Sequence, residues 1–166
     1  MAFVGIFVAM ICVISQIAIP MPSGVPITLQ IFIIAFSGYF LDLKKSILSI
    51  LIYILIGLVG VPVFSGFQSG FNALFGPTGG FIWGFVIIAV LCALSSSKSI
   101  IAISMGIVSV LICHFLGLVQ YSIITRIDFW VSAITVSLPY VLKDIAFVPL
   151  AYALSLKIKK ILKKEK

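Results

Sequence analysis

The chain has 166 residues, of which 63% are hydrophobic and only 9% are charged. Soluble domains are close to half apolar and a quarter charged, so this composition excludes a water-soluble protein. A membrane crossing takes roughly 20 apolar residues, and the chain is long enough for about six crossings with short loops. We therefore predict an all-α integral membrane protein that forms a single membrane domain over residues 1–166.

The net charge of +7 is concentrated at the end of the chain. A basic segment directly after a membrane span is typical of a cytoplasmic flank that meets anionic lipid. This distribution excludes a nucleic-acid partner and indicates membrane lipid instead. The six basic residues of this tail are Lys157, Lys159, Lys160, Lys163, Lys164 and Lys166.

Prolines, glycines and charged residues divide the apolar sequence into six predicted spans. The uncharged start at Met1 favours an uncleaved first span over a signal peptide. The segment 122–142 contains charges and a proline, which predicts a loop with an interfacial or short re-entrant helix. The predicted spans cover residues 2–19, 27–41, 46–61, 79–94, 99–121 and 143–158.

The basic residues also predict the orientation of the chain. With the amino terminus inside, the inner side holds Lys44, Lys45, Lys98 and the six tail lysines, which are nine of the eleven basic residues. Only Arg126 and Lys143 then lie outside. The positive-inside rule therefore predicts that both termini are cytoplasmic. The segments PMPSGVPITLQ, FQSGFNALFGPTGG and the region before the last span consequently share the outer face.

The outer loop GFNALFGPTGGFIWGF, Gly70–Phe85, is rich in glycine. A phosphate-binding loop needs a lysine followed by Ser or Thr after its last glycine, and neither is present here. The sequence therefore contains no recognisable ATP site. The glycines Gly76, Gly79 and Gly80 either make a tight turn that admits a helix, or present backbone amides to a polar solute.

Polar side chains near the outer face are candidates for solute binding, because ionisable groups at membrane depth usually face a cavity or pair with each other. Asp144 could accept hydrogen bonds from an N–H-rich solute, with Lys143 or Arg126 near an anionic group. Alternatively, Lys143 extends to the interface and Asp144 caps the helix. Consecutive helical residues point about 100° apart, so we predict that Lys143 and Asp144 do not pair directly.

Cys113 and His114 lie within an apolar run and lack further ligands or a base at matched spacing. We predict a helix-packing histidine, no metal site and no catalytic residue. In the first span, Gly5 and Ala9 have the small-xxx-small spacing that permits close helix approach. This face either packs internally or docks a partner subunit.

The segments SQIAIPMP, VPITLQ, LIYILIGLVGVPVFSGF and GPTGGFIWGF, with a weaker match at LPYVLKD, resemble in order and spacing the BioY family. These proteins are the biotin-specific substrate-capture (S) components of energy-coupling-factor (ECF) transporters. The resemblance implies the S-component fold of six membrane helices and a biotin pocket near the outer face. It also implies a multi-pass protein of a prokaryotic plasma membrane that works with a coupling membrane protein and two cytoplasmic ATPases. It implies transport rather than catalysis and no cofactor, with biotin as the transported ligand.

The resemblance also suggests site residues. The family often has Asp-x-x-Lys at the start of its last helix, which places Asp144 on the aspartate and Phe147 on the lysine. Lys143 is the candidate replacement for the missing cation, and Gly5 and Ala9 are candidates for partner docking. The full set of candidate substrate-binding residues is Asp144, Lys143, Asn72, Gln30, Thr28, Gly76, Thr78, Gly79, Gly80 and Tyr140.

Other functions remain open at this point. The same scaffold could bind another vitamin, such as riboflavin or thiamine, or the chain could form a self-contained pore. A membrane enzyme would need Cys113, His114 and Asp144 to meet. The predicted topology instead places the first two residues at mid-span and Asp144 near the outer surface.

Overall fold

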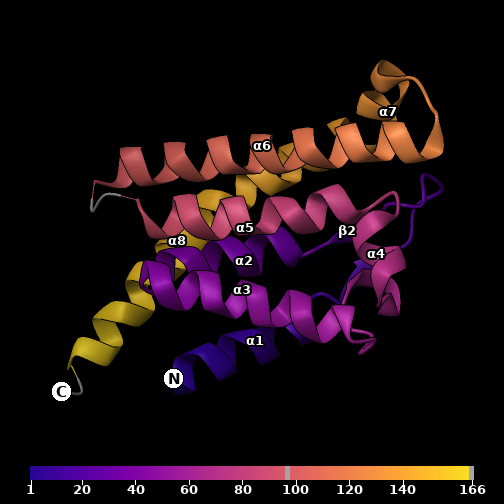
Figure 1. The fold of residues 1–166 in the computed structure, drawn as a ribbon. Helices are drawn as coiled ribbons and strands as arrows, with labels where there is room; N and C mark the ends of the chain where they lie inside the picture. Colours follow the sequence, from indigo (N-terminus) through magenta and orange to yellow (C-terminus); the bar gives the residue numbers. More distant parts are fainter. Residues whose placement is uncertain (96–97, 165–166) are drawn as a thin grey trace.

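The computed structural model describes residues 1–95 and 98–164, and this part of the chain is mainly helical (Figure 1). A two-stranded antiparallel hairpin pairs Ala18 with Thr28. The elements in chain order are α1 (Ala2–Ile14), β1 (Ala18–Ile19), β2 (Ile27–Thr28), α2 (Gln30–Phe40), α3 (Leu43–Leu58), the 3-10 turn η1 (Ser65–Phe67), α4 (Phe71–Phe75), α5 (Gly79–Ala93), α6 (Ser99–Thr125), α7 (Phe129–Val136) and α8 (Leu138–Lys164).

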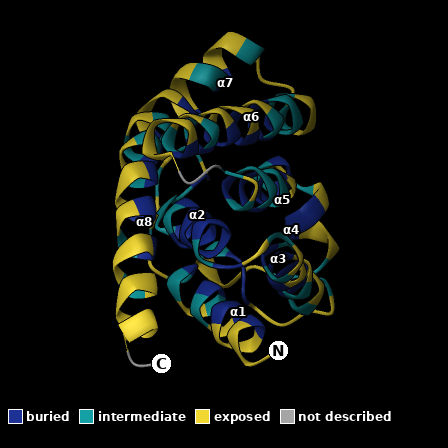
Figure 2. Cartoon of the chain, turned by 90° about the vertical axis from the view of Figure 1, so that its left-hand side faces the viewer, coloured by how far each residue is buried: buried dark blue, intermediate teal, exposed yellow. Residues whose placement is uncertain are grey.

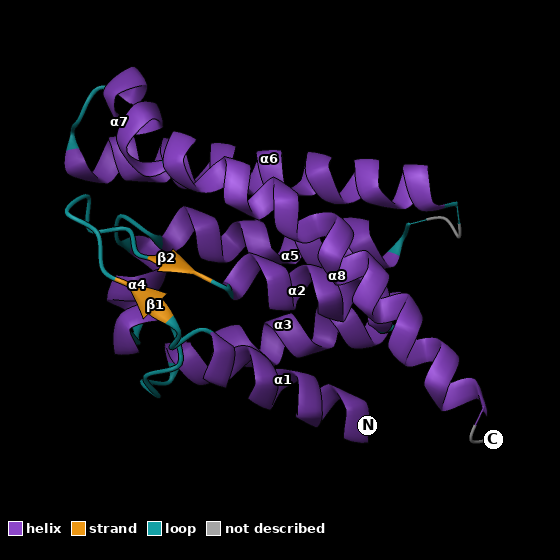
Figure 3. Cartoon of the chain, turned by 180° about the vertical axis from the view of Figure 1, so that it is seen from behind, coloured by secondary structure: helices purple, strands orange, loops and turns teal. Residues whose placement is uncertain are grey.

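The long helices lie side by side, and the irregular segments gather at one end of the molecule. Figures 1 and 3 show the strands, α4 and α7 at this end, which we call the loop end. The start of α1, the end of α5, the start of α6 and the end of α8 lie at the opposite end. Ser96 and Ser97, which belong to the predicted break after the fourth span, and the tail residue Lys166 lie outside the described residues.

Helices α2 and α5 form the centre of the bundle (Figure 2). Nine of the eleven residues of α2 are buried, and this helix packs against α5 and α8. Helix α5 also packs against α3 and α6. Its close approach to α6 requires glycine, because a Cβ at Gly80 would collide with the carbonyl oxygen of Leu116.

Several helix ends differ from the predicted spans. Helix α1 ends at Ile14 rather than near residue 19. The reason is tertiary: the Gln16 amide donates to the carbonyl oxygens of Pro62 (3.3 Å) and Phe64 (3.2 Å), while residues 18–19 pair with β2. The second helix accordingly starts at Gln30 rather than residue 27.

The last helix is longer than the predicted span 143–158, since α8 runs from Leu138 to Lys164. Pro139 lies in its first turn, where a missing N–H costs nothing. The tail lysines up to Lys164 belong to this helix. The segment 122–142 does contain a short helix, α7, which meets α8 at a bend of 52°.

Among the described residues, few helices are long and apolar enough to cross a membrane on their own. Helix α6 qualifies alone, and the bent pair α7–α8 qualifies when taken together. Helices α1, α2 and α5 are apolar but only 11–15 residues long. The structure thus confirms a helical fold, while six crossings remain a prediction.

Candidate functional site

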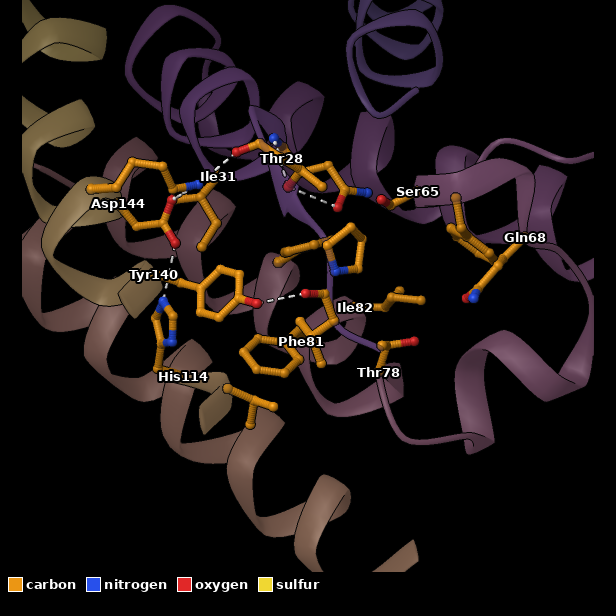
Figure 4. Close-up of a pocket in the computed structure, with 17 residues that line it drawn as sticks. Thr28, Ile31, Ser65, Gln68, Thr78, Phe81, Ile82, His114, Tyr140 and Asp144 are labelled. Atoms are coloured by element: carbon orange, nitrogen blue, oxygen red, sulfur yellow. Dashed lines mark hydrogen bonds and ion pairs between the residues drawn. The ribbon is translucent and has the colours of Figure 1, made fainter. Parts of the chain in front are cut away.

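A cavity opens at the loop end between α2, α5, α6 and the start of α8 (Figure 4). It holds about 630 Å³ of empty space including its open mouth. Val25, Ile31, Phe81 and Phe85 contribute to an apolar wall. The polar residues that line it are Thr28, Gln30, Ser65, Gln68, Thr78, His114, Tyr140, Lys143 and Asp144.

Asp144 lies at the centre of the charged side of this pocket and is only 3% exposed. Lys143 Nζ lies 2.7 Å from Asp144 Oδ1, so the prediction that these neighbours do not pair is wrong. The lysine stem is long and flexible, and its ammonium also donates to the carbonyl oxygen of Thr28 at 2.6 Å. This second contact draws the ammonium inward beside the carboxylate.

His114 contacts the other oxygen of the same carboxylate, with Nε2 3.1 Å from Asp144 Oδ2. The predicted separation between a mid-span histidine and an outer aspartate is therefore wrong. Helix α8 begins at Leu138, so Asp144 lies six residues, or about 9 Å, further along the helix axis. This depth brings Asp144 level with His114, which is itself buried and lines the pocket.

The polar residues of the second predicted span form the opposite wall. Thr28 Oγ1 donates to Gln30 Oε1 at 3.3 Å, and Gln30 Nε2 donates to Tyr53 OH at 3.0 Å. Ser15 contacts the same tyrosine hydroxyl at 3.1 Å. The Gln30 amide is therefore held by internal partners on this wall of the pocket.

Tyr140 joins the first outer loop to α8. Its hydroxyl donates to the carbonyl oxygen of Val25 at 2.7 Å and contacts Ser23 Oγ at 3.1 Å. The ring thus lies against the pocket while the hydroxyl fixes the loop (Figure 4). Of the glycine-loop candidates, Thr78 also lines the pocket.

The other glycine-loop candidates lie away from this cavity. Asn72 lines a second, more open cavity, which shares Gln68 and Thr78 with the first. Gly79 and Gly80 allow close packing, since a Cβ on either would collide with a carbonyl oxygen of Leu74 or Leu116, respectively. The carbonyl oxygen of Gly76 accepts a 2.8 Å hydrogen bond from the Gln120 amide. These contacts favour a tight structural turn over a solute-binding loop.

Gly5 and Ala9 lie on α1, whose start is at the opposite end from the loops (Figure 1). Both residues are exposed, and a Cβ added to Gly5 would meet nothing within 4 Å in the described part of the chain. The alternative that this small-residue face packs internally is therefore wrong.

Sequence reasoning missed His114 and Gln68 as pocket residues. The only signal for His114 was that it is the single histidine of the chain, and nothing in its neighbours pointed to Asp144. Among the described residues no group of His, Cys, Asp and Glu could hold a metal ion. What the pocket offers is one buried carboxylate acceptor, one cation and a mainly apolar wall.

Comparisons with known proteins match this arrangement to one family. The BioY family profile matches residues 1–164. The biotin transporter BioY of Thermotoga maritima is 35% identical over 165 residues, which cover 95% of this chain and 94% of that protein. The probable biotin transporter BioY of Pyrococcus horikoshii is 34% identical over 145 residues, covering 87% of this chain and 86% of that protein.

A solved structure shows the same fold. The crystal structure of the S-component for biotin from an ECF-type ABC transporter matches with a TM-score of 0.87 at 22% identity, covering 96% of this chain and 89% of that one. The fold comparison and the sequence matches agree along nearly the whole chain. The chain belongs to the BioY family.

Proposed function

We propose that this membrane protein is the biotin-binding S component of an ECF-type importer. The observation that carries the proposal is the buried Asp144 carboxylate, which faces an apolar-walled pocket in a chain of the BioY family. The relatives of this chain are named biotin transporters. A binding subunit needs recognition groups, and the pocket offers a carboxylate, a cation and an apolar wall.

The chemistry of biotin suits these side chains. Its ureido ring carries two N–H donors, and a carboxylate that retains free lone pairs accepts such donors well. Asp144 is therefore assigned to the ureido N–H groups. The amide of Gln68 or the hydroxyl of Thr78 would serve the ureido carbonyl, and Phe81 would pack on the apolar thiophane ring. The valerate carboxylate is assigned to Lys143 or to the open mouth of the pocket.

The proposal includes six membrane crossings with both termini in the cytoplasm. Large apolar side chains point outward along the long helices, for example Ile100 (81% exposed), Ile123 (69%) and Leu142 (69%). An exposed apolar surface of this kind suits lipid. The start of α1 and the lysine-rich end of α8 lie at the end opposite the pocket (Figure 3), so the positive-inside rule directs the pocket outward.

The proposed partners are a coupling membrane protein and two cytoplasmic ATPases, which would hydrolyse ATP for transport. The support within this chain is the exposed face of Gly5 and Ala9 on α1. Small side chains let helix backbones approach closely in a membrane. We assign this face to the coupling protein.

A Ser–His–Asp contact set raises the alternative of a membrane hydrolase. Ser137 Oγ lies 3.0 Å from His114 Nδ1, and His114 Nε2 contacts Asp144. A nucleophile must reach its substrate. Ser137 is buried and is absent from the residues that line the pocket in the described chain, so the geometry favours binding over catalysis.

Calorimetry with the purified chain in detergent tests the proposal. Biotin, riboflavin and thiamine are titrated separately into protein that has been freed of bound vitamin. We expect stoichiometric binding of biotin alone. Binding of another vitamin in its place would assign the scaffold to that vitamin, and an absence of biotin binding would overturn the proposal.

A further inference from the structure

We propose that His114 is a positioning residue that orients the Asp144 carboxylate for the ligand. This inference rests on the proposed biotin site and adds a residue to it. His114 lies on α6, whereas Asp144 and Lys143 lie on α8. The histidine therefore fixes the carboxylate from a second helix, which the neighbouring lysine cannot do.

Both ring nitrogens of His114 are in contact with named partners, and for a neutral ring these contacts select one tautomer. An ionised carboxylate only accepts hydrogen bonds, so Nε2 must carry the proton that faces Asp144 Oδ2 at 3.1 Å. In the neutral ring Nδ1 is then an acceptor, and the Ser137 hydroxyl donates to it at 3.0 Å. A neutral histidine also leaves the Lys143–Asp144 ion pair electrically balanced.

The plane of the imidazole is fixed by packing. The ring of Phe81 meets it edge to face, with centroids 5.6 Å apart and an interplanar angle of 87°. His114 is only 4% exposed, so few other orientations are open to it. A ring that is fixed on its face and at both nitrogens makes a rigid support for the carboxylate.

The consequence concerns ligand geometry. Lys143 occupies one side of Oδ1 and His114 one side of Oδ2, and each oxygen retains a further lone pair. The carboxylate can then accept only in defined directions, which suits two N–H groups held at a fixed separation in one ring. A freely rotating carboxylate would lose this advantage.

Binding measurements with matched variants test the positioning role. His114→Leu removes the donor to Asp144, and we expect biotin affinity to fall by at least about tenfold. His114→Gln restores an N–H at the distance of Nε2, so affinity should return to within a few-fold of the wild-type value. Cys113→Ser changes the adjacent buried residue, which does not line the pocket, and should bind like wild type.

The outcomes separate the two proposals. If wild-type protein binds biotin and His114→Leu binds equally well, the positioning role is wrong. If both His114→Leu and His114→Gln lose binding while their thermal unfolding matches wild type, a donor to Asp144 is insufficient and the inference is also overturned. Failure of the wild-type chain to bind biotin would instead overturn the proposed function.

A ligand-free measurement tests the hydrogen-bond arrangement independently of biotin. His114 is the single histidine, so ¹⁵N-histidine labelling gives an imidazole signal that needs no assignment. We expect a signal from an imidazole that carries a proton on Nε2 and none on Nδ1. A signal from the Nδ1-protonated tautomer, or from rapidly exchanging tautomers, would contradict the inference whatever the ligand.

Discussion

Lys143 and Asp144 are consecutive residues of α8, and their side chains nevertheless form a 2.7 Å ion pair at the wall of the pocket. The aspartate is almost wholly buried, whereas the lysine side chain is 26% exposed. The ammonium therefore reaches inward over its own helix and is held there by the carbonyl oxygen of Thr28. A buried carboxylate needs such compensation, since an unpaired buried charge is strongly unfavourable.

Removing the charge of Asp144 should abolish tight biotin binding. Asp144→Asn keeps the shape of the side chain but loses charge-assisted hydrogen bonds, each of which contributes about 1.5–3 kcal/mol. We expect affinity to fall by at least about tenfold for each such bond that is lost. Calorimetry with biotin measures the change.

Asp128 provides the matched control for this substitution. It is a second carboxylate at the loop end, but it caps α7 by accepting from the backbone N–H of Trp130 at 2.8 Å and does not line the pocket. Asn also serves as a helix N-cap, so Asp128→Asn should bind biotin like wild type. Equal affinities for Asp144→Asn and wild type would remove Asp144 from the site.

We expect that the lysine of the site can be moved from position 143 to position 147, one helical turn later, and still support biotin binding. Lys143→Met removes the ammonium, and we expect weaker biotin binding. Phe147 lies four residues later on the same face of α8, and its ring centroid is 5.6 Å from Lys143 Nζ. In the double variant Lys143→Met/Phe147→Lys, a lysine at the family position can reach Asp144 across three residues.

The double variant should therefore bind biotin more tightly than Lys143→Met alone. Phe147→Met alone is the control, because it removes the ring while it keeps Lys143. Phe147 packs edge-on against Phe32, with centroids 5.7 Å apart, so thermal unfolding of each variant is measured alongside. No recovery in a double variant that is folded would mean that the cation must stand at position 143.

The helical fold was largely predictable from the sequence, because long apolar runs admit few structures. The positions of the helix ends were not predictable. The end of α1 depends on Gln16, whose amide partners lie 46 and 48 residues away in sequence. The start of α8 depends on Pro139, which resembles a break in sequence and yet is tolerated in a first helical turn. Such helix ends depend on tertiary contacts or on position within the helix, and the local sequence pattern contains neither kind of information.

The site was predictable where ionisable or polar residues stand out in an apolar sequence. Asp144, Lys143, Gln30 and Thr28 all line the pocket. Asn72 does not, because it lies on α4 and lines the neighbouring cavity. His114 was missed because its two partners come from a segment 23 to 30 residues later, and only the packing of α6 against α8 brings them together.

The glycine loop should be sensitive to added volume rather than to lost ligand contacts. In Gly80→Ala the new Cβ would collide with the carbonyl oxygen of Leu116 on α6. Overpacking of this kind costs about 1–3 kcal/mol, so we expect a lower unfolding temperature in detergent. Gly5→Ala is the control, since its Cβ meets open space. Equal unfolding temperatures for the two variants would show that α5 and α6 can separate without cost.

The small-residue face of α1 should affect assembly and leave vitamin binding intact. Ala9→Leu adds a bulky side chain to an exposed position one turn from Gly5. If this face meets the coupling protein, the branched side chain keeps the two helices apart. We expect Ala9→Leu to copurify less coupling protein and ATPase than wild type, while calorimetry of the isolated chain gives unchanged biotin affinity.

Ile6→Leu is the matched control for docking, because Ile6 is 53% exposed on the same helix and the substitution keeps its volume. This variant should copurify the partners like wild type. The pocket lies at the loop end, far along the bundle from the start of α1 (Figure 1), so a loss of biotin binding in Ala9→Leu would indicate misfolding. Full copurification by Ala9→Leu would place the coupling surface on another helix, because a close-packed helix pair cannot accommodate the added side chain.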